Sequence, residues 1–163
     1  MTLAVQDMSI KKPDMAEFLP TAKAVLISDE GVRAKPYLDT VGKCTIGVGR
    51  NLSDKGLGRE EIEFLFQNDL HEAMQGARKA LGTNEFWSLS PVRKIVLTSM
   101  AFQMGEAGLK KFKNTLAKIR AEDFEGAAEN MLKSKWAKQT PARAKRMSYM
   151  MKNNRLHPDY ESA

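Results

Sequence analysis

Two carboxylates and a hydroxyl stand close together in the sequence around a glycine-rich turn. Asp39 lies nine positions after Glu30 and Thr45 lies fifteen positions after it, with Gly47 and Gly49 directly beyond. Two carboxyl groups can cleave a glycosidic bond, because one donates a proton to the leaving oxygen while the other activates a water or attacks the sugar. These residues predict a glycoside-cleaving site. The surrounding sequence must support that prediction, since such a pair is common by chance.

The expected roles of the three residues follow from their local surroundings. Gly31 directly follows Glu30 and predicts a helix that ends there. The unpaired carbonyl groups of a helix end form a negative pole, which favours the protonated carboxyl that a general acid needs. Partial burial of Glu30 would act in the same direction. Asp39, in a polar turn, is expected to stay ionised and act as the base, and Thr45 to hold a water against it.

The elements that must position these residues are predicted from proline, glycine and apolar spacing. Pro13 and Pro20 fit the first turns of two successive helices, the second of which ends at Glu30. Residues 33–50 are predicted to form short strands and turns, because apolar residues alternate there with small ones. Residues 51–58, rich in glycine, serine and aspartate, are predicted to form a loop.

The rest of the chain is predicted to be helical. A long helix over 59–81 carries acidic residues in its first turn and basic residues in its last, as the helix dipole favours. Ser90 and Pro91 predict the start of a helix that runs to about Met104, where Gly105 breaks the chain. Shorter helices are expected over 109–113, 115–121, 123–134 and 141–153, followed by an irregular tail from residue 157.

These elements predict a mostly helical α+β chain with two lobes. A length of 163 residues favours one domain. Within it, a small front lobe with an N-terminal extension is expected over 1–58 and an all-helical rear lobe over 82–163, with the helix 59–81 connecting them. A cleft between two lobes is a favoured place for a ligand.

Composition narrows the classes of protein that the chain can represent. Residues are 42% apolar and 28% charged, which is ordinary globular composition. No apolar run of about eighteen residues predicts a membrane span, and the first residues lack the pattern of a signal peptide, so the protein is expected in the cytoplasm of the cell that makes it. The single Cys44 excludes an internal disulfide. His71 and His157 lack ligand spacing, so neither a metal nor another cofactor is predicted.

The net charge of +6 arises in the C-terminal part of the chain. Residues 1–99 hold 13 basic and 13 acidic side chains, whereas residues 100–163 hold 13 basic and 7 acidic ones. A basic face predicts an anionic partner, such as an acidic cell-wall or outer-membrane polymer. The basic cluster Arg143, Lys145 and Arg146 lacks interleaved aromatic residues, so no nucleic-acid partner is predicted.

Three separated motifs carry a resemblance to a known family. The first combines Glu-Gly, Tyr-x-Asp-Thr-x-Gly and Thr-Ile-Gly-x-Gly between residues 30 and 49. The second is Phe-Gln-Met-Gly-Glu at 102–106, and the third includes Lys-Ser-Lys-Trp and Gln-Thr-Pro-Ala-Arg between residues 133 and 143. In this order and spacing the motifs closely resemble the phage-type lysozymes of glycoside hydrolase family 24, over about residues 24–147.

The resemblance implies a lysozyme-like fold and a specific reaction. A muramidase of this family would hydrolyse the β-1,4 bond between N-acetylmuramic acid and N-acetylglucosamine in bacterial peptidoglycan. Carried onto this sequence, Glu30 is the acid, Asp39 the base and Thr45 the residue that places the water. The implied mechanism is inverting, which keeps the two carboxyl groups roughly 6.5–9.5 Å apart to admit a water.

Further site residues are implied in the rear lobe. Substrate contacts are expected from Phe102, Gln103, Thr115 and Asn130. Arg143 is expected to approach the catalytic glutamate, where it would favour the ionised carboxyl against the helix-end effect, and the sequence leaves that balance open. Phe102 fits core packing as well as a cleft contact, and Asn130 fits a helix surface as well. Trp136 is predicted to lie in the core.

The resemblance also implies a biological setting. A phage endolysin would act as a monomer without stable membrane insertion. It would accumulate in the host cytoplasm before lysis and reach the periplasm and cell wall through a holin-type, membrane-perforating partner. Two other hypotheses remain: a lytic transglycosylase that leaves 1,6-anhydro ends, and a cationic protein that disrupts envelopes without catalysis. The intact set of Glu30, Asp39 and Thr45 argues against the last.

The chain departs from the family pattern at four places. Arg50 and Cys44 replace residues of other types, the segment 51–58 is shorter, and residues 1–20 have no clear counterpart. These differences bear on substrate preference and pH optimum rather than on the class of reaction.

Overall fold

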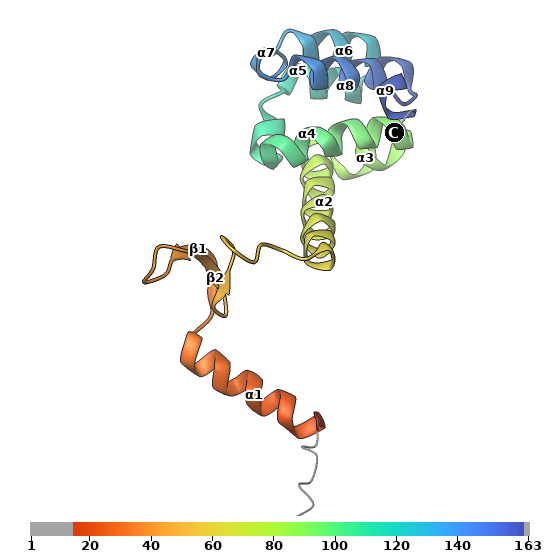
Figure 1. The fold of residues 1–163 in the computed structure, drawn as a ribbon. Coiled ribbons are helices and arrows are strands. Elements are labelled where there is room, and N and C mark those ends of the chain that lie inside the picture. Colours follow the sequence, from red (N-terminus) through yellow and green to blue (C-terminus); the bar gives the residue numbers. More distant parts are fainter. Residues whose placement is uncertain (1–14, 162–163) are drawn as a thin grey trace, which may run out of the picture. The chain divides into compact units, whose positions relative to one another are not determined.

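The computed structural model describes residues 15–161, which divide between Arg59 and Glu60 into two compact units. The first unit holds one helix and a small sheet, and the second holds the remaining described helices (Figure 1). This content confirms a mostly helical α+β fold. The predicted N-terminal extension and the predicted short helix after Pro13 fall mainly outside the described residues.

The first helix, α1, spans Met15–Glu30 and contains Pro20. The prediction of two helices, the second starting at Pro20, was therefore wrong, because a proline removes one intrahelical hydrogen bond while the turns on both sides can continue. The predicted end at Glu30 is confirmed. The amide of Gly31 donates to the carbonyl of Ile27 at 2.9 Å, and Gly31 has a φ of +71°, which is a glycine-favouring helix cap.

A three-stranded antiparallel sheet follows in the order β1-β2-β3. Its strands are β1 (Arg33–Leu38), β2 (Cys44–Gly47) and β3 (Arg50–Asn51). Tyr37 pairs with Thr45, and Thr45 pairs with Asn51 on its other side. Thr45 is thus in the central strand, in register with both neighbours, and the predicted short strands over 33–50 are confirmed.

The second unit is built from helices connected by short turns. They are α2 (Arg59–Leu81), α3 (Thr83–Ser88), α4 (Pro91–Lys110), α5 (Lys113–Arg120), α6 (Phe124–Leu132), α7 (Lys135–Gln139), α8 (Pro141–Asn153) and α9 (Pro158–Glu161). The predicted bounds of α2 and α8 are confirmed. The break predicted at Gly105 is also present, because this residue has a φ of +72° and a ψ of 170° inside α4.

Four of the predictions for this unit were wrong. The turn after α2 continues into α3, and α9 forms in the tail expected to be irregular; both helices are too short to show a 3.6-residue period. The helix expected at 109–113 does not form as a separate element, because α4 ends at Lys110 and α5 begins at Lys113. The helix expected over 123–134 ends at Leu132, because the Ser134 hydroxyl accepts the amide of Ala137 at 3.1 Å and caps a separate helix, α7.

A single apolar core holds the second unit together. Val96, Leu97 and Met100 of α4 are fully buried, as are Met131 of α6 and Met151 of α8. Methionine is flexible enough to fill the irregular space between short helices. Five described methionines are buried in this core: Met100, Met131, Met147, Met150 and Met151.

The long helix α2 contributes to this core only through its last part. Ala73, Ala77 and Leu81 are buried, whereas Ile62 and Phe66, on the same predicted apolar stripe, are about half exposed. The sequence pattern alone does not distinguish these two halves. No helix in the described part of the chain is long and apolar enough to cross a membrane.

Truncating the core should unfold the second unit at lower denaturant. Leu97→Ala removes a side chain with no exposed surface, and we expect a loss of about 2–5 kcal/mol in the free energy of unfolding. Urea unfolding followed by tryptophan fluorescence reports on this unit, since Trp87 and Trp136 are the two tryptophans of the chain. Leu132→Ala, at a side chain that is 46% exposed, is the matched control and should cost about 1 kcal/mol or less.

Candidate functional site

Glu30 ends α1 and lies against the turn between β2 and β3. Gly49 in that turn has a φ of +64°, and a methyl group added to it would stand 2.9 Å from the Oε2 atom of Glu30. That separation is shorter than a normal carbon–oxygen contact, so only glycine leaves this carboxylate where it is. The structure therefore brings Glu30 together with the glycine-rich turn that the sequence singled out. Its side chain is exposed, so the burial considered for it is not observed.

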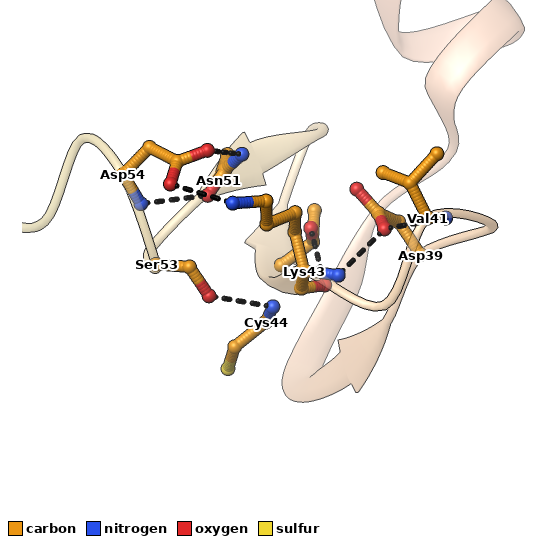
Figure 2. Close-up of polar contacts among 8 residues, drawn as sticks. Asp39, Val41, Lys43, Cys44, Asn51, Ser53 and Asp54 are labelled. Carbon is orange, nitrogen blue, oxygen red and sulfur yellow. Dashed lines mark hydrogen bonds and ion pairs between the residues drawn. The ribbon is translucent and has the colours of Figure 1, made fainter.

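Asp39 shapes the turn between β1 and β2. Its Oδ1 atom accepts the backbone amides of Val41 at 3.0 Å and Lys43 at 2.8 Å (Figure 2). The backbone of Asp39 also pairs with Lys43 and Gly42. Within the described chain, Oδ2 has no hydrogen-bond partner. One oxygen of Asp39 thus holds the turn, and the other is available to a ligand or a water.

Thr45 is buried, with 4% of its surface exposed. Among the described residues of the first unit, it is the one buried polar residue. Its hydroxyl donates to the carbonyl of Lys43 at 3.2 Å, two residues away. Since this bond uses the hydroxyl proton, only the lone pairs of Oγ1 remain for a further partner. Lys43 therefore contacts both Asp39 and Thr45 through its backbone.

The same hairpin is tied to the segment that follows it. The Lys43 ammonium group pairs with Asp54 at 2.9 Å, and the Asn51 amide donates to the other oxygen of Asp54 (Figure 2). The amide of Cys44 donates to the hydroxyl of Ser53. The Cys44 side chain is partly buried. The sequence offered no signal for these contacts, because they join residues whose spacing has no regular period.

Arg50 has a structural role in this unit. Its guanidinium group donates to the carbonyl of Gly56 through Nε at 3.0 Å and through an Nη atom at 2.8 Å. Two parallel donors on one carbonyl fix the loop that leads out of β3. Arg50 thus holds the loop that connects β3 to the second unit's sequence.

In the second unit, Gln103 is held by a residue that the sequence assigned to the core. Trp136 is 7% exposed, which confirms its burial, and its indole N–H donates to the Oε1 atom of Gln103 at 2.8 Å. A buried indole usually has such a partner. The sequence analysis missed this pair, because the two residues are 33 positions apart. Phe102 is 46% exposed and meets Phe66 edge to face, so it is not a core residue.

Thr115 and Asn130 line one groove of the second unit, together with Trp136. Thr115 is buried and Asn130 is partly exposed. Arg143 is exposed and lines a different, more apolar groove with Phe102. The predicted approach of Arg143 to the glutamate stays a prediction. Among the described residues, no group of three or more His, Cys, Asp and Glu side chains could hold a metal ion.

Comparisons with known proteins identify the family of this chain. The family model described as phage lysozyme matches residues 28–155, which include Glu30, Asp39, Thr45 and every residue placed above in the second unit. The chain therefore belongs to the phage lysozyme family, which consists of lysozyme-type peptidoglycan hydrolases.

Individual relatives extend the comparison. The chain is 30% identical to the pre-baseplate central spike protein Gp5 of Enterobacteria phage T4, over 81% of its own length and 28% of that protein. It is 29% identical to "Probable T4-type lysozyme 2" of Dictyostelium discoideum, over 77% of the chain and 89% of the relative. It is 32% identical to the peptidoglycan hydrolase gp36 of Pseudomonas phage phiKMV, over 71% of the chain and 13% of the relative. The chain thus spans a small part of the two large phage proteins and most of the amoebal one.

The contact between Gly49 and Glu30 yields a direct test. Gly49→Ala should displace the Glu30 carboxylate, and we expect the rate of peptidoglycan solubilisation to fall by about tenfold or more, because small misplacements of a reacting group are costly. Gly47→Ala is the matched control. Gly47 also has a positive φ, +67°, but an added methyl group there has no atom within 4 Å.

Both variants carry the same backbone strain, so both should lose about 1–2 kcal/mol of stability. Only Gly49→Ala should lose the additional activity. Equal rates for the two variants, measured by turbidity of a cell-wall suspension, would show that the position of Glu30 against the turn is unimportant.

Proposed function

We propose that this protein hydrolyses the β-1,4 bond between N-acetylmuramic acid and N-acetylglucosamine in bacterial peptidoglycan, by an inverting mechanism, during phage-induced lysis of the host cell. The observation that carries the proposal is the first unit itself. Glu30, Asp39 and Thr45 lie in this unit, on the end of a helix and on the hairpin that follows it. The phage lysozyme model matches this same stretch.

Glu30 is proposed as the general acid. It is the last residue of α1 and lies beside the turn between β2 and β3. Its contact with Gly49 restricts the positions open to the carboxyl group. A proton delivered from Glu30 to the glycosidic oxygen would let that oxygen leave as an alcohol.

Asp39 and Thr45 are proposed to activate the water. Oδ1 of Asp39 is committed to the turn, which leaves Oδ2 as the base. The Thr45 hydroxyl donates to the Lys43 carbonyl and can therefore meet a water only as an acceptor. Such a water would donate a hydrogen bond to the Thr45 oxygen and transfer its other proton to Asp39 as its oxygen attacks the sugar.

The second unit is proposed to supply contacts to the glycan strand. Phe102 offers an exposed aromatic ring, and the carbonyl of the Gln103 amide is fixed by Trp136, so that its NH₂ group remains to donate. Thr115 and Asn130 line a common polar groove.

Purified peptidoglycan sacculi provide the test. We expect the wild type to release reducing muropeptides, and Glu30→Gln and Asp39→Asn each to lower the rate by about 100-fold or more. Asp39→Asn is informative because the asparagine carbonyl can still accept the turn amides, while the base is lost. The masses and the anomeric form of the first products, read by mass spectrometry and NMR, report the reaction.

Asp54→Asn is the matched control. Asp54 is a second carboxylate of the same region, paired with Lys43 and outside the proposed catalytic set, and its change should leave the rate within about threefold. If the products carry 1,6-anhydro ends, the reaction is a transglycosylation and not a hydrolysis. Unimpaired killing by Asp39→Asn would instead support a non-catalytic envelope-disrupting protein.

A further inference from the structure

One peptide group of the first unit holds Thr45 and the turn of Asp39 at the same time. It joins Lys43 to Cys44, and its carbonyl oxygen accepts the Thr45 hydroxyl at 3.2 Å and the backbone amide of Asp39 at 2.9 Å. Thr45 and Asp39 are the two residues proposed to activate the water. The direction of this carbonyl therefore determines how the Thr45 hydroxyl is turned and how the loop of Asp39 closes.

The other end of the same peptide group is held by Ser53. The N–H of Cys44 donates to the Ser53 hydroxyl at 2.9 Å (Figure 2). A peptide group is planar, and in its usual trans form the N–H and the C=O point in opposite directions. Ser53 therefore fixes the direction of the Lys43 carbonyl from the opposite side. Its hydrogen bond also polarises the peptide group, which makes the carbonyl a stronger acceptor.

Ser53 is itself fixed by the segment around it. The amide of Asp54 donates to the Oδ1 atom of Asn51 at 3.0 Å, and the Nδ2 group of Asn51 donates back to Asp54 at 2.9 Å. The amide of Leu52 donates to the carbonyl of Cys44 at 2.7 Å, so both backbone groups of Cys44 are bonded to this segment. Since β3 ends at Asn51, Ser53 continues the attachment of β2 beyond the last strand pair.

A second contact between these segments has a weaker hold on the backbone. The Lys43 ammonium group pairs with Asp54 at 2.9 Å, but the two side chains are 43% and 59% exposed. An exposed ion pair is screened by water and salt, and this one acts at the end of a flexible side chain. The Ser53 hydroxyl bonds directly to the peptide group. Asp54 and Ser53 are therefore neighbours with different expected effects on the site.

We propose that Ser53 is a positioning residue that orients the Thr45 hydroxyl through the peptide group between Lys43 and Cys44. The inference rests on the proposed function, because it concerns the water that Thr45 would hold. Thr45 donates its proton to the Lys43 carbonyl, so the direction of that carbonyl determines where the lone pairs of Oγ1 point. A carbonyl without the restraint from Ser53 would let the hydroxyl turn away from the water. Ser53 thus acts through Thr45 and not on the reacting atoms.

The rotamer of Thr45 in the free protein is the first measurement. Ser53→Ala removes the hydroxyl, Ser53→Thr retains it, and Asp54→Asn is the matched control in the same segment. Three-bond NMR couplings of the Thr45 methyl carbon report its χ1 angle. We expect a single rotamer in the wild type, in Ser53→Thr and in Asp54→Asn, and a second rotamer in Ser53→Ala.

Kinetics on soluble peptidoglycan oligomers are the second measurement. We expect Ser53→Ala to lower kcat by about tenfold with KM within about twofold, because the water is misplaced while the contacts to substrate remain. Ser53→Thr and Asp54→Asn should stay within about threefold of the wild type. In a Thr45→Val background, Ser53→Ala should have no further effect on kcat, since the hydroxyl through which Ser53 acts is absent.

Three results would overturn the proposal. An unchanged Thr45 rotamer in Ser53→Ala would show that packing alone orients the hydroxyl. An unchanged kcat in the same variant would remove any role in the reaction. A loss of kcat that persists in the Thr45→Val background, or that Ser53→Thr does not restore, would make Ser53 a purely structural residue. A wild type that releases no muropeptides would contradict the proposed function and not this contact, because the rotamer measurement needs no substrate.

Discussion

The Glu30 carboxylate lies in the space that a side chain at position 49 would need, and this proximity relates the end of α1 to the turn between β2 and β3. Two glycines make it possible. Gly31 ends α1 directly after Glu30, and Gly49 leaves room for the carboxylate in a turn with positive φ. A larger residue at Gly49 would meet the Glu30 carboxylate, whereas one at Gly31 would meet no atom but would strain a backbone with positive φ. The position of Glu30, the proposed acid, therefore depends on two residues that have no side chain, Gly31 and Gly49.

The proposed catalytic residues also build the structure that holds them. Asp39 uses one oxygen for the turn and Thr45 uses its proton for the carbonyl of Lys43, so each keeps a single function for chemistry. Such double use fixes orientation, because a side chain that is already bonded samples few rotamers. It also means that removal of these residues changes local structure together with reactivity, which makes isosteric substitutions the informative ones.

The second unit keeps its packed core apart from its polar surface. Its core is aliphatic, aromatic and rich in methionine, whereas one of its grooves is lined by polar residues and lysines. Trp136 joins the two, since its ring is buried and its N–H holds Gln103. A contact of this kind lets the packed core determine the orientation of a polar group at the surface.

The features that the sequence by itself predicted correctly depend on interactions between residues that are near one another in the chain. The bounds of α2 and α8 follow from helix-dipole charges, a proline start and apolar period, and the end of α1 follows from Gly31. Three co-linear motifs indicated the family. Tertiary structure decided the rest: α3 and α9 are too short for periodicity, and the Trp136–Gln103 bond joins distant segments. It also decided which half of the α2 stripe is buried. Sequence patterns encode interactions between near neighbours, whereas these features depend on which distant surfaces meet.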